Sequence, residues 1–275
     1  MTRPLRIEVP DGIYHVTSRG NSGQPVFRDH VDRRMFLRTL ARAIDRYGWR
    51  CLSYCLLGTH YHLLLQTPRP NLSIGMRHVN GVYAQRFNQR HERHGHVFQG
   101  RYKSVLVERD EHLLWLFRYI ARNPVEAGLC SSAADWPWGS HPALLGIAPP
   151  DRLVDEDALA LFGGDRERYG RFVDDTGEHD APEPKGVILG SDAFVADNVP
   201  VEQPSREVAR AEWQPLRPEL EILFGVYEDR DEASARAYRD FGYRLQQIAD
   251  HLGCSSKTVS RRLHAWEEEM SELET

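Results

Sequence analysis

The order of β-rich and helical segments in the first part of the chain most strongly limits the fold that it can adopt. Residues 12–19 alternate apolar and polar side chains, which is typical of a strand. Two further β-rich runs, residues 49–57 and 60–67, are separated only by Gly58 and Thr59. Because two residues are the usual length of a tight hairpin connection, we expect these two strands to be antiparallel neighbours.

Two segments with helical periodicity lie between these strands and a fourth one. Apolar residues recur at helical spacing in residues 27–48, where Gly48 supplies a stop, and again in residues 71–90. A fourth β-rich run, residues 96–108, follows. This order predicts an α+β protein with a ferredoxin-like split βαβ arrangement, in which two helices cover one face of an antiparallel sheet.

A further helix is predicted from about residue 110 to the residue before Pro124, because proline disfavours helical conformation in the residue that precedes it. This helix lies outside the unit of four strands and two helices. It is therefore available to carry a function of its own.

The charges of the chain are unevenly distributed. The 275 residues carry a formal net charge of -5, but the portion up to residue 146 contains 20 Lys and Arg against 11 Asp and Glu, which leaves 15 against 29 in the remainder. This asymmetry is expected when the basic portion binds a polyanion such as nucleic acid. A solvated, arginine-rich surface is the alternative.

The cysteine spacing and the hydropathy of the sequence bear on zinc binding, secretion and membrane insertion. Cys51, Cys55, Cys130 and Cys254 lack the paired spacing of zinc ligands, and nothing at the N-terminus resembles a signal peptide. No apolar run approaches the roughly 20 residues that cross a bilayer. We therefore expect a cytoplasmic protein with free thiols and no membrane role.

The composition predicts three parts: a main domain over residues 1–146, an acidic extension with short helices over residues 147–216, and a helical domain over residues 217–275. The last part contains a helix-turn-helix pattern in which Gly253 makes the turn and Ser255 can cap the second helix. Its apolar stripe consists of Leu245, Ile248, Ala249 and Leu252, with Val259 and Leu263 facing back. The residues left to contact DNA are Ser256, Lys257, Thr258, Ser260, Arg261 and Arg262. A plain helical hairpin with a basic edge is the alternative.

Two histidines open the strand at residues 60–67. Because side chains alternate across a strand, His60 and His62 project from one face, and Tyr61 projects from the other. Two neutral imidazoles on one face can chelate a divalent metal ion and leave positions open for substrate oxygens. The alternative is a pair of structural histidines.

The added helix supplies groups that could complete such a site. Tyr119 and Asn123 stand four residues apart and share a helical face. A phenol and an amide oxygen facing two imidazoles would suit metal-assisted attack on a phosphodiester, in which the tyrosine displaces a 3′-hydroxyl and keeps a 5′-phosphate. A core aromatic is the alternative for Tyr119 taken alone.

Four ordered motifs resemble a known family. They are HYH at 60–62, GHVFQGRYKS at 95–104, RYIARNPVEAGL at 118–129 and DWPWGSH at 135–141. Together they resemble the HUH tyrosine transposases, specifically the REP-associated tyrosine transposases of bacterial chromosomes. The resemblance covers about residues 8–146, and the acidic segment and the terminal helix-turn-helix resemble the longer members of that group.

The resemblance implies a single-strand DNA endonuclease and strand transferase that uses Mg²⁺ or Mn²⁺. Carried over by position, His60 and His62 match the metal ligands, Tyr119 matches the nucleophile, and Asn123 matches the polar residue that completes the metal site. The middle residue of the HUH motif is normally a bulky hydrophobe, and Tyr61 departs from that pattern. We expect Tyr61 to pack behind the sheet, away from the site.

The segment before the added helix interleaves charged and aromatic residues, as expected of a surface that holds phosphates and stacks unpaired bases. Solvation of an exposed helix end is the alternative for the arginines. The predicted DNA contacts here are Arg86, Arg90, Gln99, Arg101, Tyr102 and Lys103.

These features predict a nucleoid-associated, metal-dependent DNA nuclease and transposase that acts on single-stranded or hairpin DNA, such as a repeated extragenic palindrome. A DNA-binding regulator that has lost strand transfer is one alternative. An RNA endonuclease of toxin type, with the histidines as acid and base and no metal, is another. Both a monomer and a homodimer are compatible with the sequence.

Overall fold

The computed structural model of the chain describes residues 6–109, 111–175, 177, 182, 184, 186–198, 219–227, 229–239 and 241–273. These residues divide into two units. The first comprises Glu8–Pro184 together with Ile188–Ser191, and the second comprises Asp192–Thr275 with two short segments from elsewhere in the chain.

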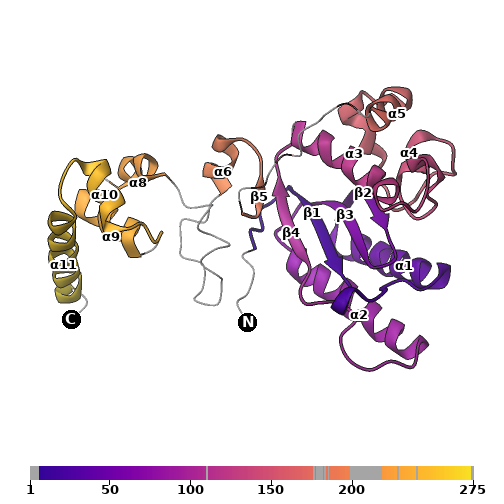
Figure 1. Ribbon diagram of the computed structural model, residues 1–275, viewed down its shortest axis with the longest axis horizontal. Helices are drawn as coiled ribbons and strands as arrows, with labels where there is room; N and C mark the ends of the chain where they lie inside the picture. The colour runs from indigo at the N-terminus through magenta and orange to yellow at the C-terminus, as the bar shows by residue number, and fades with distance from the viewer. Residues whose placement is uncertain are drawn as a thin grey trace. The chain divides into compact units, whose positions relative to one another are not determined.

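The first unit is built on a five-stranded sheet with the strand order β2-β3-β1-β4-β5 (Figure 1). The first four strands pair antiparallel, and their order is that of the predicted split βαβ arrangement. The α+β class and the hairpin between β2 and β3 are thus confirmed. The strands are β1 (Gly12–Arg19), β2 (Arg50–Leu56), β3 (His60–Thr67), β4 (Lys103–Val107) and β5 (Ile188–Leu189).

The fifth strand was not predicted. β5 pairs parallel to β4 over two residues, with Leu106 opposite Ile188 and Val107 opposite Leu189. A two-residue strand is too short to show the alternation by which longer strands are recognised in a sequence. Its pairing covers an edge of the sheet that β4 would otherwise expose.

Two helices, α1 (His30–Tyr47) and α2 (Leu72–Arg90), cover one face of the sheet (Figure 1). The Asp29 side chain accepts hydrogen bonds from two backbone N–H groups at the start of α1, and Gly48 ends the helix with a φ of 70°. Tyr61 is fully buried on this face, where its ring centroid lies 4.7 Å from that of Phe36. The expectation that Tyr61 packs behind the sheet is confirmed.

The added helix, α3 (Glu111–Glu126), packs on the opposite face. Phe117 and Ile120 are fully buried there together with Leu64 of β3. The prediction that the helix ends before Pro124 is wrong, because α3 includes this residue. A proline so near the end removes a single helical hydrogen bond, and Gly128 follows with a φ of 67°.

The chain after residue 146 continues to pack on the first unit. The Arg118 guanidinium of α3 donates to the Phe172 carbonyl at 2.7 Å and lies 3.9 Å from the Phe172 ring. The backbone of β2 also bonds to later segments, with Leu56 N–H donating to Trp138 and Asp155 N–H donating to Cys51. The remaining short elements of this unit are η1 (Asn21–Gly23), η2 (Ala133–Asp135), α4 (His141–Leu145), η3 (Glu156–Phe162) and α5 (Arg166–Asp174).

The second unit is helical and contains the predicted helix-turn-helix. Gly253 makes the turn with a φ of 63°, and the Ser255 hydroxyl accepts a hydrogen bond from Thr258 N–H at 3.2 Å. The core contains Ile248, Ala249, Val259 and Leu263, as the apolar stripe predicted. The elements are α6 (Asp192–Asn198), α8 (Leu220–Val226), α9 (Arg230–Arg239), α10 (Leu245–Leu252) and α11 (Ser256–Leu273).

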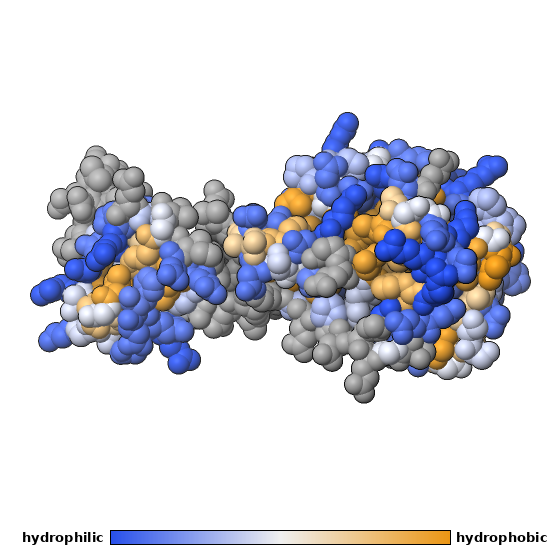
Figure 2. All heavy atoms as spheres, turned by 90° about the horizontal axis from the view of Figure 1, so that it is seen from above, coloured by the Kyte–Doolittle hydropathy of each residue, from blue (hydrophilic) through white to orange (hydrophobic). Residues whose placement is uncertain are grey.

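The predicted division at residues 146 and 216 stays a prediction. Residues 199–218, which contain the second boundary, lie outside the described part of the chain. On the face shown in Figure 2, hydrophilic side chains cover much of the described surface of both units, and hydrophobic side chains gather in smaller areas. Among the described residues, no helix has the length and apolar character that a membrane span requires.

Candidate active site and nucleic-acid interface

The register between β1 and β3 brings three histidines together on the sheet face that α3 covers. His62 lies opposite Thr17 of β1, so His15 is its diagonal neighbour. The Nε2 atom of His15 lies 3.0 Å from Nδ1 of His62, and their rings are nearly parallel with centroids 5.2 Å apart. The His60 ring lies 5.1 Å from that of His62, so the predicted pair does share one face.

Tyr119 reaches the histidines from α3. Its ring lies edge-on to His62 with centroids 5.4 Å apart and edge-on to His15 with centroids 5.9 Å apart. The Trp115 ring, one turn earlier, stacks on Tyr119 at 4.9 Å. These contacts fix the phenol beside the imidazoles, although α3 and β3 are far apart in the sequence.

Asn123 lies one turn after Tyr119 and is 9% exposed. Its Nδ2 atom donates to the Tyr119 carbonyl at 3.3 Å, and its side chain is near enough to His60 to raise the pKa of that imidazole slightly against the effect of burial. On the His60 ring, the Nδ1 atom lies 3.0 Å from the Thr59 hydroxyl. The four residues predicted as nucleophile and metal ligands therefore converge.

The surroundings keep these imidazoles neutral. Burial lowers the pKa of His62 well below its usual range and lowers the pKa of His15 to about 4. The pKa of His60 is lowered by burial and, to a smaller degree, by the positive charge of Arg19. Metal ions bind the neutral form of histidine, so this electrostatic environment suits a ligand role.

One nitrogen atom in the site lacks a hydrogen-bond partner in the part of the chain that the structure describes. The Nε2 atom of His62 is buried and has no hydrogen-bond partner among the described residues. A buried ring nitrogen without a partner is unfavourable, and a bound ion would remove that cost. The described residues contain no group of three or more His, Cys, Asp and Glu side chains arranged to hold a metal ion. The ligands that the sequence predicted, His60, His62 and Asn123, stay a prediction.

A pocket of about 780 Å³ surrounds the site and has a positively charged rim. The predicted contacts Gln99, Arg101 and Lys103 line it together with the histidines and Tyr119. Arg19, at the end of β1, also lines it and was missed by sequence reasoning. All four of these rim side chains are exposed, so the charges of the two arginines and the lysine can meet the phosphates of a nucleic acid.

The proposed stacking surface next to the pocket is corrected. Tyr102 is only 4% exposed, and its hydroxyl lies 3.3 Å from the Ser73 hydroxyl of α2. Phe98 is 8% exposed and packs on the Tyr61 ring. Arg101 and Lys103 line the pocket, whereas Tyr102 between them is buried against α2, just before β4 begins.

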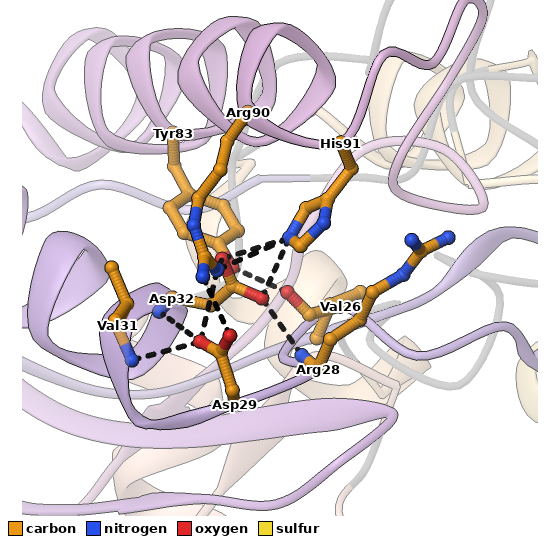
Figure 3. A network of polar contacts seen from close by, with 8 residues as sticks. All are labelled: Val26, Arg28, Asp29, Val31, Asp32, Tyr83, Arg90 and His91. Atoms are coloured by element: carbon orange, nitrogen blue, oxygen red, sulfur yellow. Dashed lines mark hydrogen bonds and ion pairs between the residues drawn. The ribbon is translucent and has the colours of Figure 1, made fainter.

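Arg90 is likewise used within the protein. It forms ion pairs with Asp29 at 2.6 Å and with the fully buried Asp32 at 2.5 Å, and His91 also contacts Asp32 (Figure 3). This network joins the start of α1 to the end of α2, in the layer that covers the other face of the sheet. Arg86 lies half-buried on α2 as well, so the structure does not bring either arginine to the pocket.

The six predicted contacts of the helix-turn-helix lie within two turns at the start of α11. Lys257 and Arg261 are exposed, whereas Arg262 forms an ion pair with Asp231 at 3.6 Å. Ser256 donates to the Gln246 side chain at 3.2 Å, and the Thr258 hydroxyl contacts Ser255 at 2.9 Å. Ser260 is half-buried. The two exposed cations are thus best placed to meet DNA.

Comparisons with known proteins support the predicted resemblance. The family described as "Transposase IS200 like" matches residues 8–123, and a homeodomain-like domain matches residues 233–271. A curated REP-associated tyrosine transposase of Haemophilus influenzae is 25% identical over 116 residues, which cover 38% of this chain and 66% of that protein.

A solved structure of a REP-associated tyrosine transposase bound to a REP hairpin aligns with a TM-score of 0.46 and 18% identity, and the alignment covers 56% of this chain and 93% of that one. The resemblance read from the four motifs is confirmed by the family match and by the curated relative. Residues 8–123 are thus similar to IS200-like transposases, and residues 233–271 are similar to homeodomain-like domains.

Proposed function

We propose that the chain is a metal-dependent endonuclease and strand transferase that acts on single-stranded hairpin DNA, such as repeated extragenic palindromes, through a 5′-phosphotyrosine. The observation that carries this proposal is the position of Tyr119, which lies against His62 in a pocket rimmed by Arg19, Arg101 and Lys103. The curated relative is named a REP-associated tyrosine transposase, and this name supports repeated palindromic DNA as the substrate.

The reaction would be a single in-line exchange at phosphorus. The Tyr119 oxygen forms a bond to phosphorus while the bond from phosphorus to the 3′ oxygen breaks, and the phenolic proton passes through solvent to that oxygen. The products are a DNA end with a free 3′-hydroxyl and a 5′-phosphate joined to Tyr119. A 3′-hydroxyl that later attacks this phosphotyrosine restores the tyrosine and joins the two DNA ends.

His60, His62 and Asn123 are the residues that would hold Mg²⁺ or Mn²⁺. Such an ion would supply charge stabilisation at the phosphate as the bonds to phosphorus change. Mg²⁺ is bound mainly by oxygen ligands, so two imidazole nitrogens favour Mn²⁺ among the two. The chain's own cations would hold the flanking phosphates, and the Trp115 ring would keep the phenol in place during the exchange.

The alternative of a metal-independent RNA endonuclease is disfavoured by the state of the histidines. A general acid must carry a proton at the working pH. The pKa of His62 lies well below its usual range and that of His60 is also lowered, so neither ring holds a second proton near neutral pH.

The C-terminal helix-turn-helix would assist target selection through Lys257 and Arg261.

The test is incubation of the full chain with an end-labelled, single-stranded DNA hairpin, with Mn²⁺ or with EDTA, followed by a denaturing gel. We expect a covalent adduct with Mn²⁺, none with EDTA and none for Tyr119→Phe. Tyr61→Phe is the matched control, since that phenol lies on the other face of the sheet, and it should still form the adduct. DNA binding without an adduct, over a panel of hairpins and both metals, would favour the regulator.

A further inference from the structure

His15 contacts a proposed metal ligand, and none of the motifs considered above assigns it a role. The distance of 3.0 Å between His15 Nε2 and His62 Nδ1 is that of a hydrogen bond. A neutral imidazole carries one N–H and one lone pair, so one ring must donate and the other must accept. The direction of this hydrogen bond decides what the second nitrogen of His62 presents to the site.

The two directions have different chemical consequences. If His62 donates from Nδ1, its Nε2 atom keeps a lone pair that can bind a cation. If His15 donates from Nε2, His62 must carry its own proton on Nε2 and can serve only as a donor there. The buried Nε2 atom has no hydrogen-bond acceptor among the described residues, so a proton placed on it would be left unpaired.

We infer that His15 is a positioning residue that accepts a hydrogen bond from His62 Nδ1 and so holds His62 with the lone pair of Nε2 available to a divalent cation. The inference rests on the proposed function, because it assigns a use to His62 as a ligand. Metal-binding histidines are commonly fixed in this way by a group on their other nitrogen, and here that group is a second imidazole on the neighbouring strand.

The near-parallel rings support a fixed arrangement. The planes of His15 and His62 differ by 13°, and both rings meet Tyr119 edge-on, at 81° and 83°. Rotation of His62 about its own side chain would therefore disturb contacts with His15 and with Tyr119 at once. His15 thus orients the ligand in the position where the phenol also rests.

The first test reads the tautomer directly and needs neither metal nor DNA. Ring ¹⁵N correlation spectra of the full chain, labelled with ¹⁵N-histidine, distinguish a proton on Nδ1 from one on Nε2, and His62→Gln assigns the signal. We expect His62 to be protonated on Nδ1 in the wild type. In His15→Leu the proton should move toward Nε2, and His15→Gln, whose amide oxygen can accept in place of the imidazole, should restore Nδ1.

A wild-type His62 protonated on Nε2 would overturn the inference, and so would a tautomer that does not change in His15→Leu. Thermal unfolding of each variant shows whether the spectra come from folded protein. His141→Gln is the matched control, because His141 is buried and bonded to Tyr169 outside the pocket, and it should leave the His62 signal unchanged.

The second test measures Mn²⁺ affinity by calorimetry on the same proteins. We expect His15→Leu to bind Mn²⁺ about 10-fold to 100-fold more weakly than the wild type, with His15→Gln much closer to the wild type and His141→Gln equal to it. Equal affinity in His15→Leu and the wild type would overturn the inference alone. A wild type that binds no Mn²⁺ would overturn the metal site of the proposed function and the positioning role together.

Discussion

The Tyr119 ring stands edge-on to His62, with an interplanar angle of 83°, and stacks on Trp115 with an angle of 14°. The proposed nucleophile is therefore held between a ring of its own helix and a ring of the sheet. The Tyr119 hydroxyl has no hydrogen-bond partner among the described residues. The position of the phenol is thus set by packing, while its oxygen is left to the substrate.

The stacking partner gives a test of this positioning. Trp115→Leu removes the ring that holds Tyr119, so the rate of adduct formation should fall about 10-fold to 100-fold, since small displacements of reacting groups cost about that much. The affinity for a DNA hairpin should change little. Trp115→Phe keeps a stacked ring and should recover most of the rate. A Leu variant as fast as the wild type would show that the stack does not position the nucleophile.

Loss of an arginine at the pocket rim should weaken DNA binding, whereas loss of an arginine on α2 should lower stability. Arg101→Ala should weaken binding of single-stranded DNA and reduce the slope of log affinity against log salt by about 0.7, as expected for one lost phosphate contact. Arg90→Ala should leave that slope unchanged but lower the thermal midpoint, because it leaves the buried Asp32 carboxylate without its arginine.

Fluorescence anisotropy at several salt concentrations and thermal melts measure both effects. A salt slope that falls in Arg90→Ala and stays constant in Arg101→Ala would place the DNA on the helical face of the sheet instead.

All parts of the proposed site come from one chain, which predicts that one chain is sufficient for cleavage. A mixture of His60→Ala and Tyr119→Phe should therefore form no adduct, because each protein lacks one essential group. The wild type diluted with either variant is the positive control. An adduct formed by the mixture but by neither variant alone would show that active sites assemble from two chains.

The packing of α5 on α3 predicts where the chain can be cut. A protein that ends after residue 150 loses α5, which packs around Phe117 through Tyr169 and holds Arg118 through Phe172. It should fold poorly, as read by thermal unfolding. A protein that ends after residue 191 keeps these contacts and β5, and should form the adduct with a short hairpin but choose among targets less strictly. Unchanged selectivity would show that the helix-turn-helix is irrelevant to targeting.

Stability should depend on pH through the buried His141. Burial lowers the pKa of His141 from 6.5 to about 4 in the folded protein. Between these two pH values the unfolded chain therefore binds a proton at His141 that the folded protein does not bind. The free energy of unfolding should therefore fall as the pH drops from 7 to 4.5. His141→Gln should make this fall smaller, by about 2 kcal/mol at pH 4.5. Urea denaturation at both pH values measures it, and equal pH dependence in the two proteins would contradict the account.

Much of the arrangement follows from local patterns. The alternation along residues 60–67 predicts that His60 and His62 share one face of a strand. Helical spacing predicts that Tyr119 and Asn123 share one face of a helix, and in the structure this face of α3 lies against that face of β3. The same alternation along the predicted strand at residues 96–108 separates Tyr102 from Arg101 and Lys103, which agrees with the burial of Tyr102.

Other features depend on contacts between distant segments, which local patterns do not specify. His15 enters the site only through the register of β1 against β3, and Arg90 is taken up by carboxylates of another helix. Arg19 reaches the pocket because β1 ends beside the residues that precede β4. The positions of these three residues depend on how strands and helices pack together, which the local sequence pattern does not show.

The most direct measurement is mass spectrometry of the proteolysed adduct, with the DNA trimmed to its last nucleotide. The account predicts a single modified peptide with the nucleotide on Tyr119, linked through the 5′-phosphate, and a released DNA fragment that ends in a 3′-hydroxyl. A nucleotide on Tyr61 or any other residue, or a linkage through a 3′-phosphate, would contradict the central claim that Tyr119 attacks and the 3′ oxygen leaves.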